Sequence, residues 1–129
     1  MSFQILVVDD DVFMAKIVAL CLAPVGNFMV IPAFDGWSAL QLAETVAPDL
    51  IVLDYDLPHQ DGLEVLRAMR SQPALQPLPI IAVTGALADL PRCAQFVAES
   101  DAFLSKPLDF RLLRRTVLHS LRLPTAVTA

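Results

Sequence analysis

Hydrophobic and polar positions along the chain follow two alternating patterns. Short runs that are almost wholly apolar and bounded by charged or turn-forming residues predict strands, at residues 5–8, 29–31, 50–53, 80–83 and 102–104. Longer stretches in which apolar residues recur with helical spacing predict helices, over residues 12–22, 37–46, 63–70, 90–99 and 110–121. Strand and helix therefore alternate five times along the chain.

The alternation predicts an α/β fold built on a parallel sheet. Each strand is apolar along nearly its whole length, so helices should cover both faces of the sheet through right-handed crossovers. Pro32 cannot donate a ladder hydrogen bond, which places the second strand at an edge of the sheet or ends it there. Asp61 and Asp89 are predicted to cap the third and fourth helices.

The first helix is predicted to bury one apolar face, made by Met14, Ile17, Val18 and Cys21. Phe13 and Leu20 fall to one side of that face, and we expect them at the surface. Cys21 and Cys93 are the only cysteines and lie far apart in predicted helices. They are interpreted as small buried hydrophobic residues rather than as a disulfide or a metal pair.

Composition narrows the class of protein. With 129 residues, 56% hydrophobic and 18% charged, the chain is typical of one folded domain, expected over residues 1–123 and followed by a tail over 124–129. The formal charge of −5 gives no general attraction to nucleic acid or to anionic membranes. Three aspartates stop the first apolar run, which lacks a preceding basic region, so no signal peptide or membrane span is expected and a cytoplasmic location is favoured.

Polar side chains follow four of the predicted strands at their carboxyl ends. In open parallel sheets, ligands bind at this edge, where the strand order reverses. Loops after strands are often polar and Asp is a common cap, which would explain one or two carboxylates but not so many together. The predicted rim consists of Asp9, Asp10, Asp11, Asp54, Asp56, Thr84 and Lys106.

Such a rim favours a hard divalent cation. Converging carboxylates repel one another, and a cation relieves that repulsion. Mg²⁺ prefers oxygen ligands and commonly keeps waters and phosphate oxygens, so two or three carboxylates with a backbone carbonyl suit it. Zinc is disfavoured because His59 and His119 have no partner at ligand spacing, and both are interpreted as solvent-facing. We therefore expect Mg²⁺ as the cofactor.

Carboxylates, a lysine and a hydroxyl at one rim are typical of phosphoryl transfer, which depends on positioning and on stabilising charge. Asp54 is the strongest candidate nucleophile, because an aspartate can form an acyl phosphate. A metal ion and Lys106 would offset the repulsion between this carboxylate and an incoming phosphate. Thr84 could then donate a hydrogen bond to a phosphoryl oxygen.

Four segments in order carry a family resemblance: residues 5–11, 49–58 together with 61–62, 80–85 and 103–107. They make the chain resemble the response-regulator receiver domains of two-component signal transduction, and in particular stand-alone receivers of the chemotaxis-regulator kind. The resemblance covers nearly the whole chain. It implies a flavodoxin-like, doubly wound (βα)5 fold with a five-stranded parallel sheet in the order 2-1-3-4-5, which agrees with an edge position for the strand that contains Pro32.

The resemblance also implies roles at the rim. Asp54 is implied to be the phosphoacceptor and, with Asp10, a side-chain metal ligand. Asp9 would act on the metal through water, and Asp56 would offer its main-chain carbonyl. Lys106 would bind the phosphoryl group, and the peptide bond that follows it would be cis. Asp11 is interpreted as a helix cap rather than as a ligand.

Receivers similar to this chain switch when a Ser or Thr, here Thr84, moves towards the phosphoryl group and an aromatic residue, here Phe103, turns inward. Phe103 stands where a Tyr is common, so any readout would rest on packing rather than on a hydroxyl. Glu99 stands where receivers usually have a Gly that ends the fourth helix. A non-Gly residue is costly in a left-handed cap, so we expect this helix to end differently.

The resemblance implies a histidine kinase or a histidine phosphotransfer protein as the phosphoryl donor, and we hypothesise that Phe13 contributes to its docking. Only 23 residues follow Lys106, too few for a DNA-binding module. The expected output is a contact with a downstream target protein, or self-association through the fourth helix, fifth strand and fifth helix. No direct binding to nucleic acid or membrane is expected. The domain would promote its own Mg²⁺-dependent phosphorylation and slow dephosphorylation and is not otherwise expected to be an enzyme.

The alternative is an aspartate-nucleophile phosphohydrolase of the haloacid-dehalogenase type. Asp54 and Asp56, which follow an apolar strand with one residue between them, resemble the Asp-x-Asp signature of that family. That family needs a further acidic pair after its lysine, whereas here only Asp109 follows Lys106 and the acidic triplet precedes Asp54. The order of these residues along the chain argues against this alternative.

Overall fold

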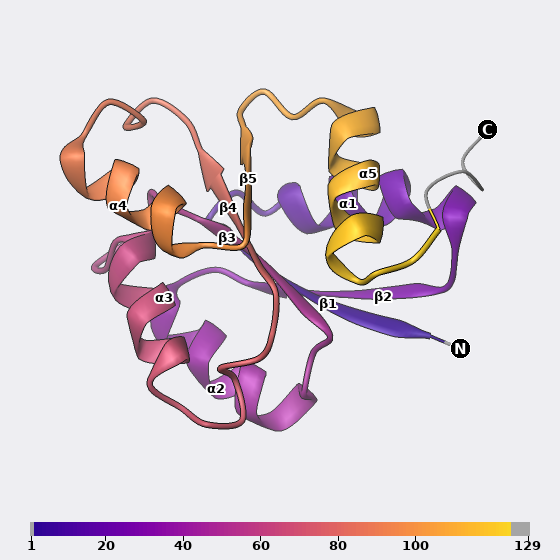
Figure 1. The fold of residues 1–129 in the computed structure, drawn as a ribbon, viewed down its shortest axis with the longest axis horizontal. Helices are drawn as coiled ribbons and strands as arrows, with labels where there is room; N and C mark the ends of the chain where they lie inside the picture. The colour runs from indigo at the N-terminus through magenta and orange to yellow at the C-terminus, as the bar shows by residue number, and fades with distance from the viewer. Residues whose placement is uncertain (1, 125–129) are drawn as a thin grey trace.

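A computed structural model describes residues 2–124 of the chain. Its centre is a five-stranded parallel sheet in the order β2-β1-β3-β4-β5, which confirms the predicted topology (Figure 1). The end of the predicted tail, residues 125–129, lies outside the described residues. The strands are β1 (Phe3–Val8), β2 (Phe28–Ala33), β3 (Leu50–Asp54), β4 (Ile80–Thr84) and β5 (Ala102–Ser105).

Helices follow the strands as the hydrophobic pattern predicts. They are α1 (Met14–Leu22), α2 (Gly36–Val46), α3 (Gly62–Arg70), α4 (Pro91–Glu99) and α5 (Phe110–Ser120), with a short 3-10 helix, η1 (Ala23–Val25), after α1. Helix α1 begins two residues later than predicted, because residues 11–13 form a turn ahead of it. No helix within the described residues is long and apolar enough to cross a membrane.

Helices cover both faces of the sheet, so the strands that lie inside it are buried on both sides. One apolar cluster joins the sheet to α2, α3 and α4, and a second joins it to α1 and α5 (Figure 1). Alternate strand residues supply the two clusters: Leu6 belongs to the first and Ile5 to the second. All residues of β3 and β4 are buried, which explains why these strands are apolar without alternation.

Strand β2 lies at an edge of the sheet, as Pro32 indicated. Among the described residues it pairs only with β1, and Pro32 stands beside Val7 in the register. The proline does not end the strand, which continues to Ala33. An edge position tolerates proline because one side of the strand has no ladder partner.

Two of the predicted helix caps have different outcomes. The Asp61 side chain accepts a hydrogen bond from the Glu64 amide at 2.9 Å and caps α3, as predicted. Asp89 does not cap α4: Leu90 precedes that helix, and no side chain caps it. Proline at the first helical position has no amide hydrogen to satisfy, which reduces the need for a cap.

Helix α4 ends differently from the family pattern, as its sequence led us to expect. Glu99 is its last residue, and the next residue, Ser100, has extended backbone angles with φ −89° rather than a left-handed conformation. The hydroxyl of Ser100 donates to the carbonyl of Val97 at 2.7 Å. The helix therefore ends without glycine and without backbone strain.

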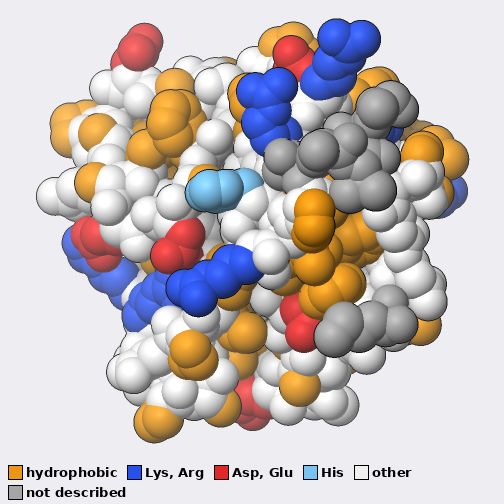
Figure 2. Space-filling view, turned by 45° about the vertical axis from the view of Figure 1, so that its right-hand side comes forward, with side chains coloured by type: hydrophobic (Ala, Val, Ile, Leu, Met, Phe, Trp, Pro, Cys, Tyr) orange, Lys and Arg blue, Asp and Glu red, His pale blue; other side chains and the backbone are white. Residues whose placement is uncertain are grey.

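The surface and the core largely follow the sequence pattern. On α1, Ile17 is only half-buried, whereas Phe13 and Leu20 are exposed as predicted. Cys21 and Cys93 are buried and free. On the face drawn in Figure 2, Lys and Arg side chains lie beside acidic ones instead of forming a continuous basic field.

Candidate functional site

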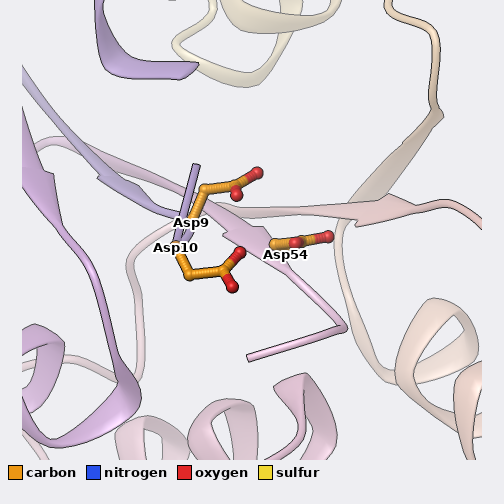
Figure 3. A group of neighbouring side chains, drawn as sticks. All are labelled: Asp9, Asp10 and Asp54. Atoms are coloured by element: carbon orange, nitrogen blue, oxygen red, sulfur yellow. The ribbon is translucent and has the colours of Figure 1, made fainter. Parts of the chain in front are cut away.

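The sheet order brings the predicted carboxylates together. Strands β1 and β3 are neighbours, with Val8 beside Leu53, so the residues that end them share the carboxyl edge. Asp9, Asp10 and Asp54 each offer an oxygen, and these three oxygens lie within 4.8 Å of one another (Figure 3). The geometry therefore joins two adjacent acidic groups, Asp9 and Asp10, to a third, Asp54, which follows more than forty residues later in the sequence.

Asp9 is held rigidly at the bottom of this group. Its side chain is 3% exposed, and one oxygen, Oδ1, accepts a hydrogen bond from the Asp11 amide at 2.9 Å. The other oxygen, Oδ2, lies 3.0 Å from Lys106 Nζ as an ion pair. That contact lacks hydrogen-bond geometry, so Oδ2 is a buried oxygen without a hydrogen-bond partner among the described residues.

Asp54, the last residue of β3, is 4% exposed and accepts a hydrogen bond from Lys106 Nζ at 3.2 Å. Burial raises the pKa of its carboxyl to about 6, and the negative charge of Asp9 contributes in the same direction. The Lys106 ammonium lowers that pKa but does not cancel the effect of burial. Asp54 is therefore ionised at neutral pH, in surroundings that penalise its charge.

Lys106 follows β5 and is the cation of the site. Partial burial opposes its charge, but the contacts with the Asp9 and Asp54 carboxylates outweigh burial and raise the pKa of its ammonium. Its backbone amide donates to the carbonyl of Thr84 at 2.8 Å, which fixes it beside the end of β4. The Lys106–Pro107 peptide bond is cis, as the resemblance implied.

A cavity of about 250 Å³ opens beside these groups. It is large enough for a small anion and lies directly at the carboxyl ends of the central strands. Thr84 is buried at the end of β4, close to this edge, and Asp56 exposes its side chain. The residues that line the cavity are Asp10, Asp54, Tyr55, Asp56, Gly85, Ala86, Leu87 and Lys106.

Other candidate residues lie apart from the carboxylate group. Asp11 Oδ1 accepts from the Phe13 amide at 2.9 Å in the turn ahead of α1. The N-cap position of that helix is Phe13 and no side chain caps it, so the interpretation of Asp11 as a helix cap was wrong. His59 and His119 are exposed, as predicted. Phe103 on β5 is 56% exposed and lines a groove of about 480 Å³ beside α5, so it faces away from the carboxylates.

The three carboxylates fit a hard divalent cation. Three negative groups meet one ammonium, which leaves uncompensated negative charge at the carboxyl edge. All three candidate side-chain ligands are carboxylates. One of their oxygens, Asp9 Oδ2, accepts no hydrogen bond from the described residues. Mg²⁺ suits such a set, because it prefers oxygen ligands and keeps several waters.

Residues that the sequence pattern did not assign to the site support the backbone at Asp54 and Tyr55. The Gly62 amide donates to the carbonyl of Tyr55 at 2.7 Å, and the Tyr55 hydroxyl lies 3.3 Å from Asp61 Oδ2. A Cβ at Gly62 would stand 2.7 Å from the carbonyl oxygen of Asp54, so the start of α3 approaches the strand too closely for any larger residue. In the sequence, Asp61 and Gly62 indicated a helix start and belonged to the family resemblance, but neither pattern gave them a role in supporting Asp54.

The strand order and the lysine-paired acidic group define a doubly wound α/β domain with a charged site at the carboxyl edge of its sheet. The sequence comparison identifies the family. Residues 5–118 match the family described as the response regulator receiver domain. The chain therefore belongs to the response regulator receiver family, a class of signalling domains rather than classical enzymes. The phosphohydrolase alternative finds no support.

Several curated relatives are named as regulators. The chain is 36% identical over 122 residues to the alkaline phosphatase synthesis transcriptional regulatory protein PhoP of Bacillus subtilis, covering 95% of this chain and 50% of that protein. It is 38% identical over 126 residues to the response regulator MprA of Mycobacterium ulcerans, covering 92% of this chain and 53% of that protein. The chain thus spans about half the length of these relatives.

Solved structures show the same fold. The signal receiver domain of a DNA-binding response regulator from Colwellia psychrerythraea is 30% identical, with a TM-score of 0.81 over 93% of this chain and 98% of that one. The receiver domain of the Francisella response regulator 1452 is also 30% identical, with a TM-score of 0.79 over 93% and 97%. Both comparisons agree with the observed strand order.

Proposed function

We propose that this domain accepts a phosphoryl group on Asp54 from a phosphohistidine of a sensor kinase or a histidine phosphotransfer protein, and that it changes a protein-binding surface in response. The observation that carries the proposal is the pairing of a buried Asp54 with Lys106, 3.2 Å apart, beside two further carboxylates. This arrangement makes a nucleophilic carboxylate available at neutral pH and supplies a cation for the incoming phosphate.

Apart from the metal, the chain and the donor provide the groups that take part in the transfer. An oxygen of the ionised Asp54 carboxylate attacks phosphorus while the bond from phosphorus to the donor imidazole nitrogen breaks. The imidazole leaves with the electron pair and takes up a proton from solvent water. Lys106 stabilises charge on the phosphoryl oxygens, and the Thr84 hydroxyl donates to one of them.

Mg²⁺ would be held by Asp10 and Asp54, by the main-chain carbonyl of Asp56 and, through water, by Asp9. When bound, it would offset the charge of the carboxylates and of the phosphoryl group. The domain would thereby promote both its own phosphorylation and its own dephosphorylation, and the dephosphorylation would be slow. It would not turn over a separate substrate repeatedly.

The response would begin at Thr84 and Phe103. Movement of the Thr84 hydroxyl towards the phosphoryl group would open space behind it, into which the Phe103 ring would turn. Phe103 is exposed beside a groove along α5, so its inward movement would alter the surface formed by α4, β5 and α5. Because Phe103 has no hydroxyl, the change would be one of packing.

The proposed partners are proteins. Phe13 is exposed at the start of α1, close in sequence to Asp9 and Asp10, and we infer that it helps to dock the donor. If Phe13→Ala left transfer from the donor unchanged, this docking role would be wrong. The changed surface would bind a downstream target protein or a second copy of the chain. The domain would not contact nucleic acid or membrane directly, and it would act in the cytoplasm.

The proposed receiver unit covers residues 1–123, slightly more than the 5–118 that match the family. A transcriptional role, as in the name of the Bacillus relative, would need sequence beyond this unit, because the chain covers half of that protein. For this unit we propose only that it accepts a phosphoryl group and changes a protein-binding surface.

Incubation with acetyl phosphate and Mg²⁺ tests the proposal. We expect at most one equivalent of protein-bound, acid-stable and base-labile phosphate, with slow release. Fast release of many equivalents of phosphate would instead indicate a phosphohydrolase. Asp56→Asn keeps the main-chain carbonyl and should remain phosphorylatable, whereas Asp54→Asn should not.

A further inference from the structure

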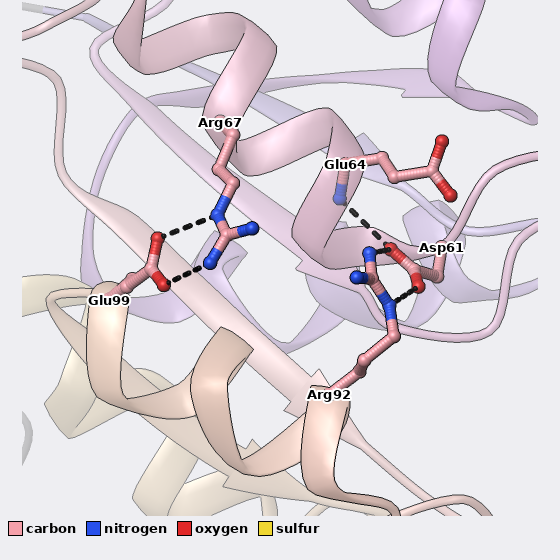
Figure 4. Close-up of polar contacts among 5 residues, drawn as sticks. All are labelled: Asp61, Glu64, Arg67, Arg92 and Glu99. Carbon is pink, nitrogen blue, oxygen red and sulfur yellow. Dashed lines mark hydrogen bonds and ion pairs between the residues drawn. The ribbon is translucent and has the colours of Figure 1, made fainter.

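Helices α3 and α4 are joined by an ion pair at each end (Figure 4). Arg92, in the first turn of α4, donates from Nε to Asp61 Oδ2 at 2.7 Å and from Nη2 to Oδ1 at 3.1 Å. At the other end, Arg67 of α3 donates to both oxygens of Glu99, at 3.1 and 2.8 Å. Both pairs are bidentate, a geometry that fixes orientation as well as distance.

Buried apolar groups fill the space between these two pairs. Phe96, in the middle of α4, is fully buried, and its ring lies 5.6 Å from the ring of Tyr55. The same ring approaches Gly62 at the start of α3. The α4 helix is therefore held at three levels against α3 and the segment after β3.

The opposite side of α4 has no comparable attachment. Within the described residues, no α4 side chain forms a hydrogen bond or an ion pair with β5 or α5. Figure 1 shows the same arrangement, with α4 beside α3 and away from α5. The polar side-chain contacts of α4 therefore attach it to α3 and its N-cap, although the chain continues from α4 directly into β5.

The phosphoryl-binding groups of the proposed site also lie outside this network. Thr84 leads into the loop of residues 85–90, and Lys106 leads into residues 107–109 ahead of α5. Neither residue contacts Arg92, Glu99 or their partners through any hydrogen bond or ion pair in the described chain. A displacement that starts at Thr84 therefore reaches the loop before it reaches the ends of α4.

From these contacts we infer that the Asp61–Arg92 and Arg67–Glu99 pairs form a clamp, which keeps α4 docked on α3 in both phosphorylation states and confines the switch to residues 85–90 and β5. This inference rests on the proposed function, because it concerns what phosphorylation moves. Glu99 takes the position where receivers usually have a helix-ending glycine, so one half of the clamp is a departure of this chain from the family pattern.

The clamp consists of partly exposed groups, so its strength should be moderate and sensitive to salt. The side chains of Arg67, Arg92 and Glu99 are 42–52% exposed, and that of Asp61 is 22% exposed. The Arg92 hydrogen bonds lower the pKa of Asp61, which agrees with a stable charged pair. Loss of both pairs should raise the opening equilibrium of α4 about 2- to 30-fold.

Hydrogen–deuterium exchange of the amides of residues 91–99 provides the first test, without any phosphoryl group. The clamp variant Arg92→Gln with Glu99→Gln should exchange about 2- to 30-fold faster in this segment than the unsubstituted chain. The control variant Glu44→Gln with Arg111→Gln removes the same charges from exposed positions that form no ion pair in the described chain, and it should leave α4 unchanged. Equal exchange in the clamp variant and the unsubstituted chain would overturn the clamp.

Salt supplies a measurement that needs no variant. Raising sodium chloride to about 1 M screens exposed pairs, so exchange over residues 91–99 should accelerate in the unsubstituted chain more than exchange over α2. This comparison holds even if the double variant folds poorly. No acceleration specific to α4 would contradict the clamp.

Beryllofluoride with Mg²⁺, a mimic of the phosphoryl group, tests the confinement of the switch. In the unsubstituted chain, exchange should change over residues 85–90 and 102–106 and stay constant over 91–99. In the clamp variant, the change should spread into 91–99. An equal change in α4 of the unsubstituted chain would refute confinement, whereas absence of any beryllofluoride effect would refute the proposed function and leave the free-state result standing.

Discussion

The ammonium of Lys106 lies 3.2 Å from Oδ2 of Asp54. The same ammonium lies 3.0 Å from Oδ2 of Asp9, so one cation is shared between two buried carboxylates. Asp10 adds a third acidic group to this set. The carboxyl edge of the sheet therefore carries negative charge that the protein alone does not neutralise.

Asp54→Asn should stabilise the metal-free protein at pH 7. The pKa of Asp54 is raised from 3.8 to about 6, so between these values the unfolded chain has released a proton that the folded chain still holds. The free energy of unfolding contributed by this group therefore falls as pH rises from about 4 to 6 and is level above that. Removing the charge should restore about 1–3 kcal/mol at pH 7 and little at pH 4.

Urea denaturation with a metal chelator, at pH 4 and pH 7, measures this difference. Asp109→Asn is not a suitable comparison because Asp109 caps α5, whereas Glu44→Gln removes an exposed charge and should show no such pH dependence. A destabilised Asp54→Asn protein at pH 7 would contradict the assigned cost of burial.

Lys106→Met should raise the pKa of Asp54 beyond its value of about 6. The ammonium is the group that lowers this pKa, so its loss leaves burial and Asp9 unopposed. Carbon-13 NMR of the aspartate carboxyl groups, titrated with pH in the absence of metal, gives the value directly. Lys16→Met removes an exposed lysine on α1 and should leave the Asp54 titration unchanged.

Asp10→Asn should weaken Mg²⁺ binding by roughly tenfold or more, because it removes one anionic oxygen from the three-carboxylate group. Isothermal titration calorimetry measures the affinity. The neighbouring Asp11→Asn is a matched control: its Oδ1 accepts from the Phe13 amide, and asparagine can preserve that bond. Equal losses in the two variants would show that general charge, rather than coordination, determines binding.

Gly62→Ala should destabilise the fold by about 1–3 kcal/mol, since the added Cβ would meet the Asp54 carbonyl at 2.7 Å and the Tyr55 Cα at 2.8 Å. Both contacts are with backbone atoms, which have little freedom to adjust. At Gly85 the nearest atom to an added Cβ is 3.6 Å away, so Gly85→Ala should cost much less. Urea denaturation of the two variants compares these costs, and similar losses would be unexpected.

Much of this structure follows from hydrophobic pattern. Buried strands such as β3 and β4 are apolar without alternation. The carboxylates at the ends of β1 and β3 must meet once these two strands are parallel neighbours. For this reason the group of Asp9, Asp10 and Asp54 could be predicted from the sequence alone.

Other features depend on pairings that are distant in sequence. Asp89 does not cap α4 because the helix begins at Pro91, with Leu90 at the N-cap position. Residue type alone does not determine this starting point. The bond between Arg92 and Asp61 joins residues 31 positions apart on two helices, and neither residue shows in sequence which partner it will find. Long-range charge pairs of this kind become visible only when the helices are placed.

The most direct test of the central claim is intact-protein mass spectrometry after incubation with acetyl phosphate and Mg²⁺. The proposed function predicts the mass of one added phosphoryl group on the unsubstituted chain, loss of that addition with a metal chelator, and no addition to Asp54→Asn. Persistence of the same addition in Asp54→Asn would contradict the assignment of Asp54 as the phosphoacceptor.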